Sequence, residues 1–317
     1  MSIVTVIIPI LDAMPYLTEA LASLEAQTFR NFEVCLWDNG SIDGSVEEAK
    51  RWIPGRLPGR VVTGCPLPLH ECLAKMVEEA RTEFVARMDG DDWIPSERFE
   101  LQLSALNFDN KLIGIGGQLE IMDSTGKRIG DLPYPISYAA VLGRLLSSSP
   151  LPHAAMVMRR EAIIACGNYK YPQPIEDFDL WFRFLQKGPV ICLNKLVYKY
   201  RILGSGITEQ AKKAERHNIA LFECLRRNVP EFFNIPAEAF EKLYRKKHPM
   251  AFLPLSRAAA TISRLSEIEM KSVLACPEFL FSARCYTARW DLCSKVVYRL
   301  WEQRYKNNAL LKLSGRN

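Results

Sequence analysis

The sequence FVARMDGDDW, residues 84–93, joins an apolar run to three carboxylates within four positions. Residues 84–86 are typical of a buried strand, and carboxylates at the end of a packed strand repel one another and lose hydration. Such a cluster therefore usually has a cation to neutralise it. Mg²⁺ or Mn²⁺ suits oxygen ligands, binds few carboxylates, and completes its shell with water and substrate phosphates. This stretch predicts a metal-bound diphosphate at a strand end.

A calcium-binding EF-hand loop is a competing interpretation of the same residues. Asp89, Asp91 and Glu100 fit the first, third and twelfth positions of such a loop. Trp93 and Pro95 occupy the fifth and seventh positions, however, and the sixth position lacks the required glycine. We therefore exclude an EF-hand. A plainer alternative is a solvated turn in which Asp92 caps the next helix.

The flanking residues alternate strand and helix signals, which predicts βαβ units and a mostly parallel sheet in the first hundred residues. Strands are expected at residues 4–8, 32–37 and 61–62, and helices from Pro15 and over residues 69–80. Asp43 is placed to cap the helix after the second strand. Beyond Gly206 the chain is predicted to form helices interrupted by prolines. We expect an α/β domain over residues 1–205 and a helical extension over 206–317.

Composition bounds the class of protein. The 317 residues are 48% hydrophobic and carry a net charge of +5, which suits anionic phosphates or an anionic membrane surface but not nucleic acid. Nine cysteines without a Cys-x-x-Cys pair are expected to be reduced thiols. No signal-peptide pattern or membrane-spanning run is present in the sequence, so a cytoplasmic protein is expected.

Five motifs in order give the N-terminal two-thirds a resemblance to family 2 glycosyltransferases of the non-processive type, enzymes with a GT-A fold. They are VIIP (6–9), QTFRNFE (27–33), DNGSIDGS (38–45), ARMDGDD (86–92) and IEDFDLW (175–181). The resemblance implies a mixed α/β sheet of the nucleotide-diphospho-sugar transferase kind. It also implies transfer of a sugar from a nucleotide-diphosphate donor to a hydroxyl, with inversion at the anomeric carbon.

The same resemblance assigns roles to individual residues. It implies a donor site at the strand ends and a divalent cation, Mn²⁺ or Mg²⁺, held by Asp91 or Asp92, which offsets charge on the leaving diphosphate. Asp177 is implied as the general base, with Glu176 beside it raising its basicity. The residues implied in donor or acceptor binding are Pro9, Leu11, Asp38, Asn39, Asp89, Asp91, Glu176 and Arg201.

Several of these residues also have structural interpretations. Asp177 could be a helix N-cap, and Asp38 with Asn39 could form a plain turn. His153 is at least as well explained by a buried structural histidine as by an acceptor contact. Arg201 is equally well explained as a surface arginine. On the helix that follows residue 176, Trp181 and Phe182 are expected in the core because they fall on its apolar stripe.

Two positions depart from the family pattern and keep other functions open. Leu11 stands where many relatives place an aromatic residue to stack on the base, and Asn39 replaces the second aspartate of a pair. Both weaken the expectation of a UDP-linked donor and leave room for a non-catalytic nucleotide-sugar-binding module. A sugar nucleotidyltransferase is a further alternative, but residues 9–15 lack its glycine-rich triphosphate loop.

The last predicted helix, within residues 293–317, combines apolar and basic side chains. A basic amphipathic helix can lie on an anionic bilayer, which would suit a lipid-linked acceptor and a peripheral location at the inner face of the membrane. Packing against the rest of the protein is the alternative. The overall expectation is a glycosyltransferase of surface polysaccharide synthesis that acts on a glycan or lipid-linked acceptor.

Overall fold

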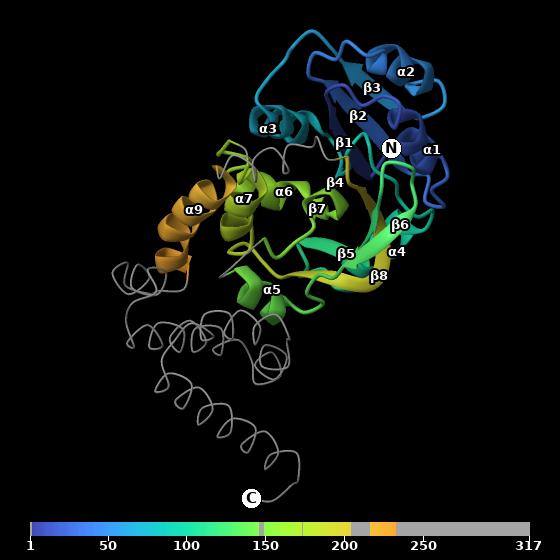
Figure 1. Cartoon of the computed structure of the whole chain (residues 1–317). Coiled ribbons are helices and arrows are strands. Elements are labelled where there is room, and N and C mark those ends of the chain that lie inside the picture. Colours follow the sequence, from blue (N-terminus) through green and yellow to red (C-terminus); the bar gives the residue numbers. More distant parts are fainter. Residues whose placement is uncertain (1, 146–148, 173, 204–215, 233–317) are drawn as a thin grey trace, which may run out of the picture. The chain divides into compact units, whose positions relative to one another are not determined.

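The computed structural model describes residues 2–145, 149–172, 174–203 and 216–232. The chain divides into two compact units, residues 1–136 with 149–224 and residues 137–148 with 225–317. The first unit carries an eight-stranded sheet with its helices (Figure 1). The described part of the second unit consists of α5 (Tyr138–Leu145) and the end of α9 (Arg216–Phe232).

The sheet is mixed, with strand order β3-β2-β1-β4-β7-β5-β6 and β8 paired to β5. Its strands are β1 (Val4–Ile10), β2 (Phe32–Asp38), β3 (Gly59–Val62), β4 (Phe84–Arg87), β5 (Gly114–Met122), β6 (Arg128–Leu132), β7 (Val157–Arg159) and β8 (Val190–Arg201). The first four strands pair with one another in parallel, as the alternating pattern predicted. Strand β7 then runs antiparallel to β4 and β5, whereas β8 is parallel to β5.

Strand β1 lies in the centre of the parallel half and is covered on both faces. Val4, Val6 and Ile8 belong to the main core cluster, together with the apolar stripe of α1 (Leu17–Glu25). Ile7 is equally buried but points to the opposite face. Burial on both faces explains why the strand is a continuous β-branched run instead of an alternating one.

The remaining helices of the first unit connect successive strands. They are α2 (Ser45–Trp52), α3 (Leu69–Glu79), α4 (Arg98–Phe108), the short 3₁₀ helix at His153–Ala155, α6 (Arg160–Ala165) and α7 (Glu176–Phe184). In α7, Trp181 and Phe182 are 0% and 1% exposed, which confirms their core assignment. Asp43 does not itself occupy the N-cap of α2, which is Gly44 with a φ of 92°. Its carboxylate instead accepts hydrogen bonds from the backbone N–H groups of Ser45 and Met14.

Several features of the chain lie partly or wholly outside the described residues. No helix in the described part is long and apolar enough to cross a membrane. The basic helix predicted within residues 293–317 lies outside it, as does most of the predicted extension from residue 206, so both stay predictions. The described cysteines are all free, in agreement with the reduced thiols expected: Cys35, Cys65, Cys72, Cys166, Cys192 and Cys224.

Candidate active site

A cavity of about 550 Å³ lies at the carboxyl ends of the neighbouring parallel strands β1 and β4. Loops after parallel strands converge at these ends, which is where α/β sheets bind ligands. The cavity is lined by Pro9, Ile10, Leu11, Asp12, Ala13, Met14, Tyr16, Asn39, Leu67, Pro68, Leu69, Cys72, Arg87, Asp89, Gly90, Asp91, Ser124 and Leu203. Its lining therefore combines apolar residues with three aspartates and an arginine.

The acidic loop, residues 89–93, is held in place by β8. The backbone N–H of Asp89 donates to the Tyr198 hydroxyl at 3.0 Å. Trp93 and Lys199 exchange two backbone hydrogen bonds of 3.2 and 2.8 Å. Because β8 fixes both ends of this loop, its side chains have a defined orientation before any ligand binds.

The three carboxylates of the acidic loop have different surroundings. Asp89 and Asp91 line the cavity and are partly buried, and Asp89 forms an ion pair with Arg87. Asp92 is only 1% exposed and accepts a hydrogen bond from the backbone N–H of Arg201 at 2.7 Å. Burial and the charge of Asp89 raise the pKa of Asp91 to about 6, and the same two causes raise the pKa of Asp92 well above its usual value. The surroundings of Asp91 and Asp92 therefore disfavour their charged forms, and a bound cation would favour them.

The aspartates of the acidic loop fit a divalent cation whose coordination shell is completed by a bound substrate. No group of three metal-ligating side chains occurs among the described residues. Asp91 offers an oxygen ligand in the cavity wall beside Asp89, while Asp92 is buried and does not line the cavity. Mg²⁺ and Mn²⁺ are commonly held by one or two carboxylates plus phosphate oxygens, so such a site would be complete only with a diphosphate bound. The cation would supply Lewis-acid stabilisation of that diphosphate.

The predicted donor-binding residues at the ends of β1 and β2 differ in whether they line the cavity. Pro9 and Leu11 line the cavity, and the Leu11 side chain is 58% exposed and therefore accessible to a ligand. Asn39 also lines it, but its side-chain oxygen accepts a hydrogen bond from the Leu67 backbone at 2.6 Å. Asp38 is buried and accepts hydrogen bonds from two amides of its own loop, so its carboxylate supports the turn. A donor contact of Asp38 stays a prediction.

The second acidic cluster lies at the start of α7. Asp177 accepts a hydrogen bond of 3.4 Å from the Ser149 hydroxyl, which also accepts one from the Trp181 indole. Burial raises the pKa of Asp177. Burial and the charge of Asp177 raise the pKa of Glu176 to about 8. This pair is within electrostatic range of Arg87, the last residue of β4, and so lies near the acidic loop.

The raised pKa of Glu176 leads to a prediction about stability and pH. Between the ordinary pKa of 4.5 and about 8, the unfolded chain releases this proton while the native protein retains it, so unfolding becomes easier as pH rises. Glu176→Gln should therefore raise the free energy of unfolding at pH 8 by at least about 1 kcal/mol and change it little at pH 4. Denaturant unfolding of both proteins at the two pH values measures this. An equal difference at both pH values would contradict it.

Two other charged or polar candidates have mainly protein partners. His153 hydrogen-bonds the Tyr169 hydroxyl at 2.7 Å and packs against the Trp181 ring, and burial lowers its pKa well below the usual value. These contacts fit a neutral structural histidine. Arg201 is 3% exposed and is not a surface arginine, and its guanidinium binds protein groups behind the cavity wall.

The structure also places in the cavity residues that the sequence analysis did not single out. Arg87 is 4% exposed and contributes to the lining, and Ser124 reaches it from the turn after β5. A charged residue at the end of the apolar run in β4 was the available signal for Arg87, because such residues are rarely buried without a partner. Nothing local distinguishes Ser124 from other turn serines.

The acidic loop and the cavity lie at the carboxyl ends of parallel strands, which is where open α/β sheets bind their ligands. Residues 5–167 match the sequence pattern of glycosyl transferase family 2. The chain belongs to this family and is a glycosyltransferase. It is 31% identical over 189 residues to the amylovoran biosynthesis glycosyltransferase AmsE of Erwinia amylovora, covering 58% of this chain and 70% of that protein.

Solved structures share the fold at low sequence identity. S. aureus TarS 1-349 in complex with UDP-GlcNAc superimposes with a TM-score of 0.54 and 17% identity, covering 97% of this chain and 92% of TarS 1-349. The mannosyltransferase PcManGT of Pyrobaculum calidifontis, in complex with GDP-Man and Mn²⁺, gives a TM-score of 0.57 and 17% identity over 99% and 88% of the two chains. These neighbours are GT-A glycosyltransferases, which establishes the GT-A fold expected from the motifs.

Proposed function

We propose that this protein is an inverting glycosyltransferase that moves a sugar from a UDP-linked donor to a hydroxyl of a glycan or lipid-linked acceptor. We place it in the synthesis of a surface polysaccharide. The observation that carries the proposal is the cavity in which Asp89 and Asp91 stand at the end of β4, with the Glu176–Asp177 pair nearby. The similarity to an amylovoran biosynthesis enzyme supports the polysaccharide assignment.

The cavity has the properties of a donor site. Its volume of about 550 Å³ lies within the range of small-molecule pockets. The apolar residues after β1, including Leu11 and Met14, can contact a base, and Asp89 and Asp91 can reach a diphosphate through a divalent cation. The bound UDP-GlcNAc in TarS and GDP-Man in PcManGT make a nucleotide-diphosphate sugar the expected ligand class. We favour a UDP-linked sugar over a GDP-linked one.

The acceptor reaction assigns a role to Asp177. Its carboxylate takes the proton of the acceptor hydroxyl while that oxygen forms a bond to the anomeric carbon of the donor sugar. The bond from this carbon to the diphosphate breaks, and the nucleoside diphosphate leaves with the bonding electrons. A single displacement of this kind inverts the anomeric configuration. Burial favours the role, because the raised pKa makes Asp177 a stronger base than an exposed aspartate.

Incubation with a panel of nucleotide sugars tests this function directly. We expect the protein to consume a UDP-sugar only when Mn²⁺ or Mg²⁺ is present, by slow hydrolysis alone and faster with a suitable acceptor. Proton NMR of the product should show the anomeric configuration opposite to that of the donor. A product that retains the configuration would contradict inversion, and consumption of a nucleoside triphosphate and a sugar phosphate instead would indicate a nucleotidyltransferase. Cytoplasmic location and peripheral membrane contact stay predictions.

A further inference from the structure

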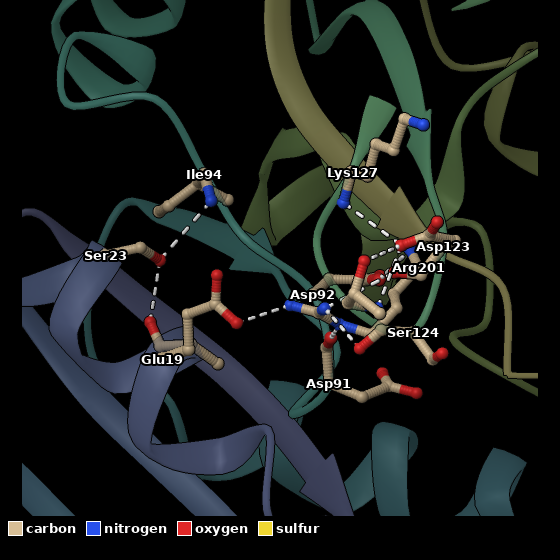
Figure 2. A network of polar contacts seen from close by, with 11 residues as sticks. Glu19, Ser23, Asp91, Asp92, Ile94, Asp123, Ser124, Lys127 and Arg201 are labelled. Carbon is tan, nitrogen blue, oxygen red and sulfur yellow. Dashed lines mark hydrogen bonds and ion pairs between the residues drawn. The ribbon is translucent and has the colours of Figure 1, made fainter. Parts of the chain in front are cut away.

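Arg201, the last residue of β8, places its guanidinium among three separate segments behind the cavity wall. Its Nε donates to the backbone carbonyl of Asp91 at 2.8 Å, and its Nη2 pairs with Glu19 of α1 at 2.6 Å. Its Nη1 approaches the carbonyls of Asp123 and Ser124, at 3.5 and 3.3 Å. Figure 2 shows Arg201 between Glu19 on one side and the turn after β5 on the other.

The groups that Arg201 contacts are largely the wall of the cavity itself. Asp91 and Ser124 both line the cavity. Tyr16 lines it too, and the centroid of its ring lies 4.6 Å from the guanidinium carbon of Arg201. Arg201 does not line it and is 3% exposed. Each nitrogen of its guanidinium already has a protein acceptor, so it has little capacity left for a ligand.

The turn that Arg201 holds is itself well ordered. The Asp123 carboxylate accepts a hydrogen bond from the backbone N–H of Thr125 at 2.8 Å. It accepts a second from the backbone N–H of Lys127 at 3.1 Å (Figure 2). The turn is therefore rigid, and the Arg201 side chain, which donates to its carbonyls, fixes the position of Ser124. Arg201 also donates to the backbone carbonyl of Asp91, one of the three aspartates that line the cavity.

We propose that Arg201 is a positioning residue that joins α1, the acidic loop and the turn at residues 123–127 into one rigid wall of the donor site, without touching the donor. The ligand part of this inference rests on the proposed function. A direct contact of Arg201 with the donor diphosphate, as the family resemblance suggests, is the competing role. The two roles differ in what they require, because a diphosphate needs a positive charge, whereas the wall needs the forked geometry of a guanidinium.

Arg201→Lys separates the two roles, since lysine keeps the charge and loses the fork. We expect UDP to bind about 10- to 100-fold more weakly in the presence of Mn²⁺, because the carbonyls of Asp91 and Ser124 lose buried hydrogen bonds. Arg159→Lys is the matched control. Arg159 likewise donates to the carbonyls of Leu112 and Leu106 and pairs with Glu83, but outside the cavity lining, so its variant should lose stability and bind UDP normally.

Hydrogen–deuterium exchange of the ligand-free protein tests the wall independently of any donor. In Arg201→Lys, the amides of residues 89–93 and 123–127 should exchange faster, while those of β1 stay protected as in the wild type. Unchanged exchange in both segments would overturn the positioning role whether or not the protein binds UDP. If faster exchange occurs in a protein that binds no nucleotide diphosphate, the wall is supported and only the proposed function fails.

Glu19→Gln is a second variant that distinguishes the two roles of Arg201 if Arg201→Lys does not fold. Glutamine preserves an acceptor for the guanidinium and removes a negative charge from a side chain that is 49% exposed. If Arg201 only positions the wall, UDP affinity should stay within about threefold of the wild type or fall. If Arg201 binds the diphosphate, loss of the competing carboxylate should tighten UDP binding, and this result would overturn the proposal.

Discussion

Asp177→Asn is expected to lower the turnover rate by a factor of roughly 10² to 10⁴ while the nucleotide sugar and the cation still bind. The substitution keeps the shape of the side chain and removes its basicity. Burial, which raises the pKa of Asp177, and the hydrogen bond from Ser149 both hold this carboxylate in a defined place at the start of α7. Initial rates at saturating donor, with binding of the donor measured separately, test this expectation.

A structural role for Asp177 makes a different prediction. Asparagine is also favourable at a helix start, so a residue needed only for the helix would leave turnover near normal in Asp177→Asn. Asp179→Asn provides the control in the same helix, because the Asp179 carboxylate pairs with Arg183 at 2.8 Å and is 1% exposed. That variant should lower the melting temperature with a much smaller effect on turnover. Unchanged turnover and melting temperature in Asp177→Asn would exclude it as the base and direct attention to Glu176.

Asp91→Asn is expected to weaken binding of Mn²⁺ in the presence of UDP by about 10- to 100-fold, because a lost contact to a charged group costs roughly 1.5–3 kcal/mol. Asp91 lines the cavity, and burial together with the charge of Asp89 disfavours its ionised form, which a cation would stabilise. Equilibrium dialysis of Mn²⁺ with and without UDP measures the effect. Equal Mn²⁺ binding by the wild type and the variant would remove Asp91 from the metal site.

Asp92→Asn tests the second predicted metal ligand in the same experiment. Asp92 is 1% exposed and accepts a hydrogen bond from the Arg201 backbone, and asparagine can keep that acceptor. The placement favours a structural role, so the variant should bind Mn²⁺ nearly as well as the wild type. A loss as large as that in Asp91→Asn would instead support Asp92 as a ligand.

The sequence predicted the parallel half of the sheet well because its strands are buried on both faces and leave continuous apolar runs. Strand β6 was missed because its residues, RIGDL, are exposed or only partly buried and carry no apolar alternation. Strand β8 also lacks a continuous apolar run, because exposed and partly buried residues at 193–196 interrupt it.

Within the site, carboxylate spacing indicated the acidic loop but not the function of each carboxylate. Local sequence could not show that Asp92 points toward Arg201, because that contact joins residues 109 positions apart. The same holds for the ion pair between Arg201 and Glu19, which are 182 positions apart. Long-range contacts of this kind determine which polar residue faces a ligand and which supports the wall, and periodicity carries no information about them.

Calorimetric titration of UDP into the wild-type protein, once with Mn²⁺ and once with EDTA, tests the metal-dependent donor site most directly. A donor site completed by a cation and a diphosphate predicts clear heat and saturable binding with Mn²⁺, and binding at least about tenfold weaker with EDTA. Titration of GDP under the same conditions tests the choice of base. Equal UDP affinity with and without the cation would contradict the metal site, and the absence of binding by either nucleotide in both conditions would contradict the donor cavity itself.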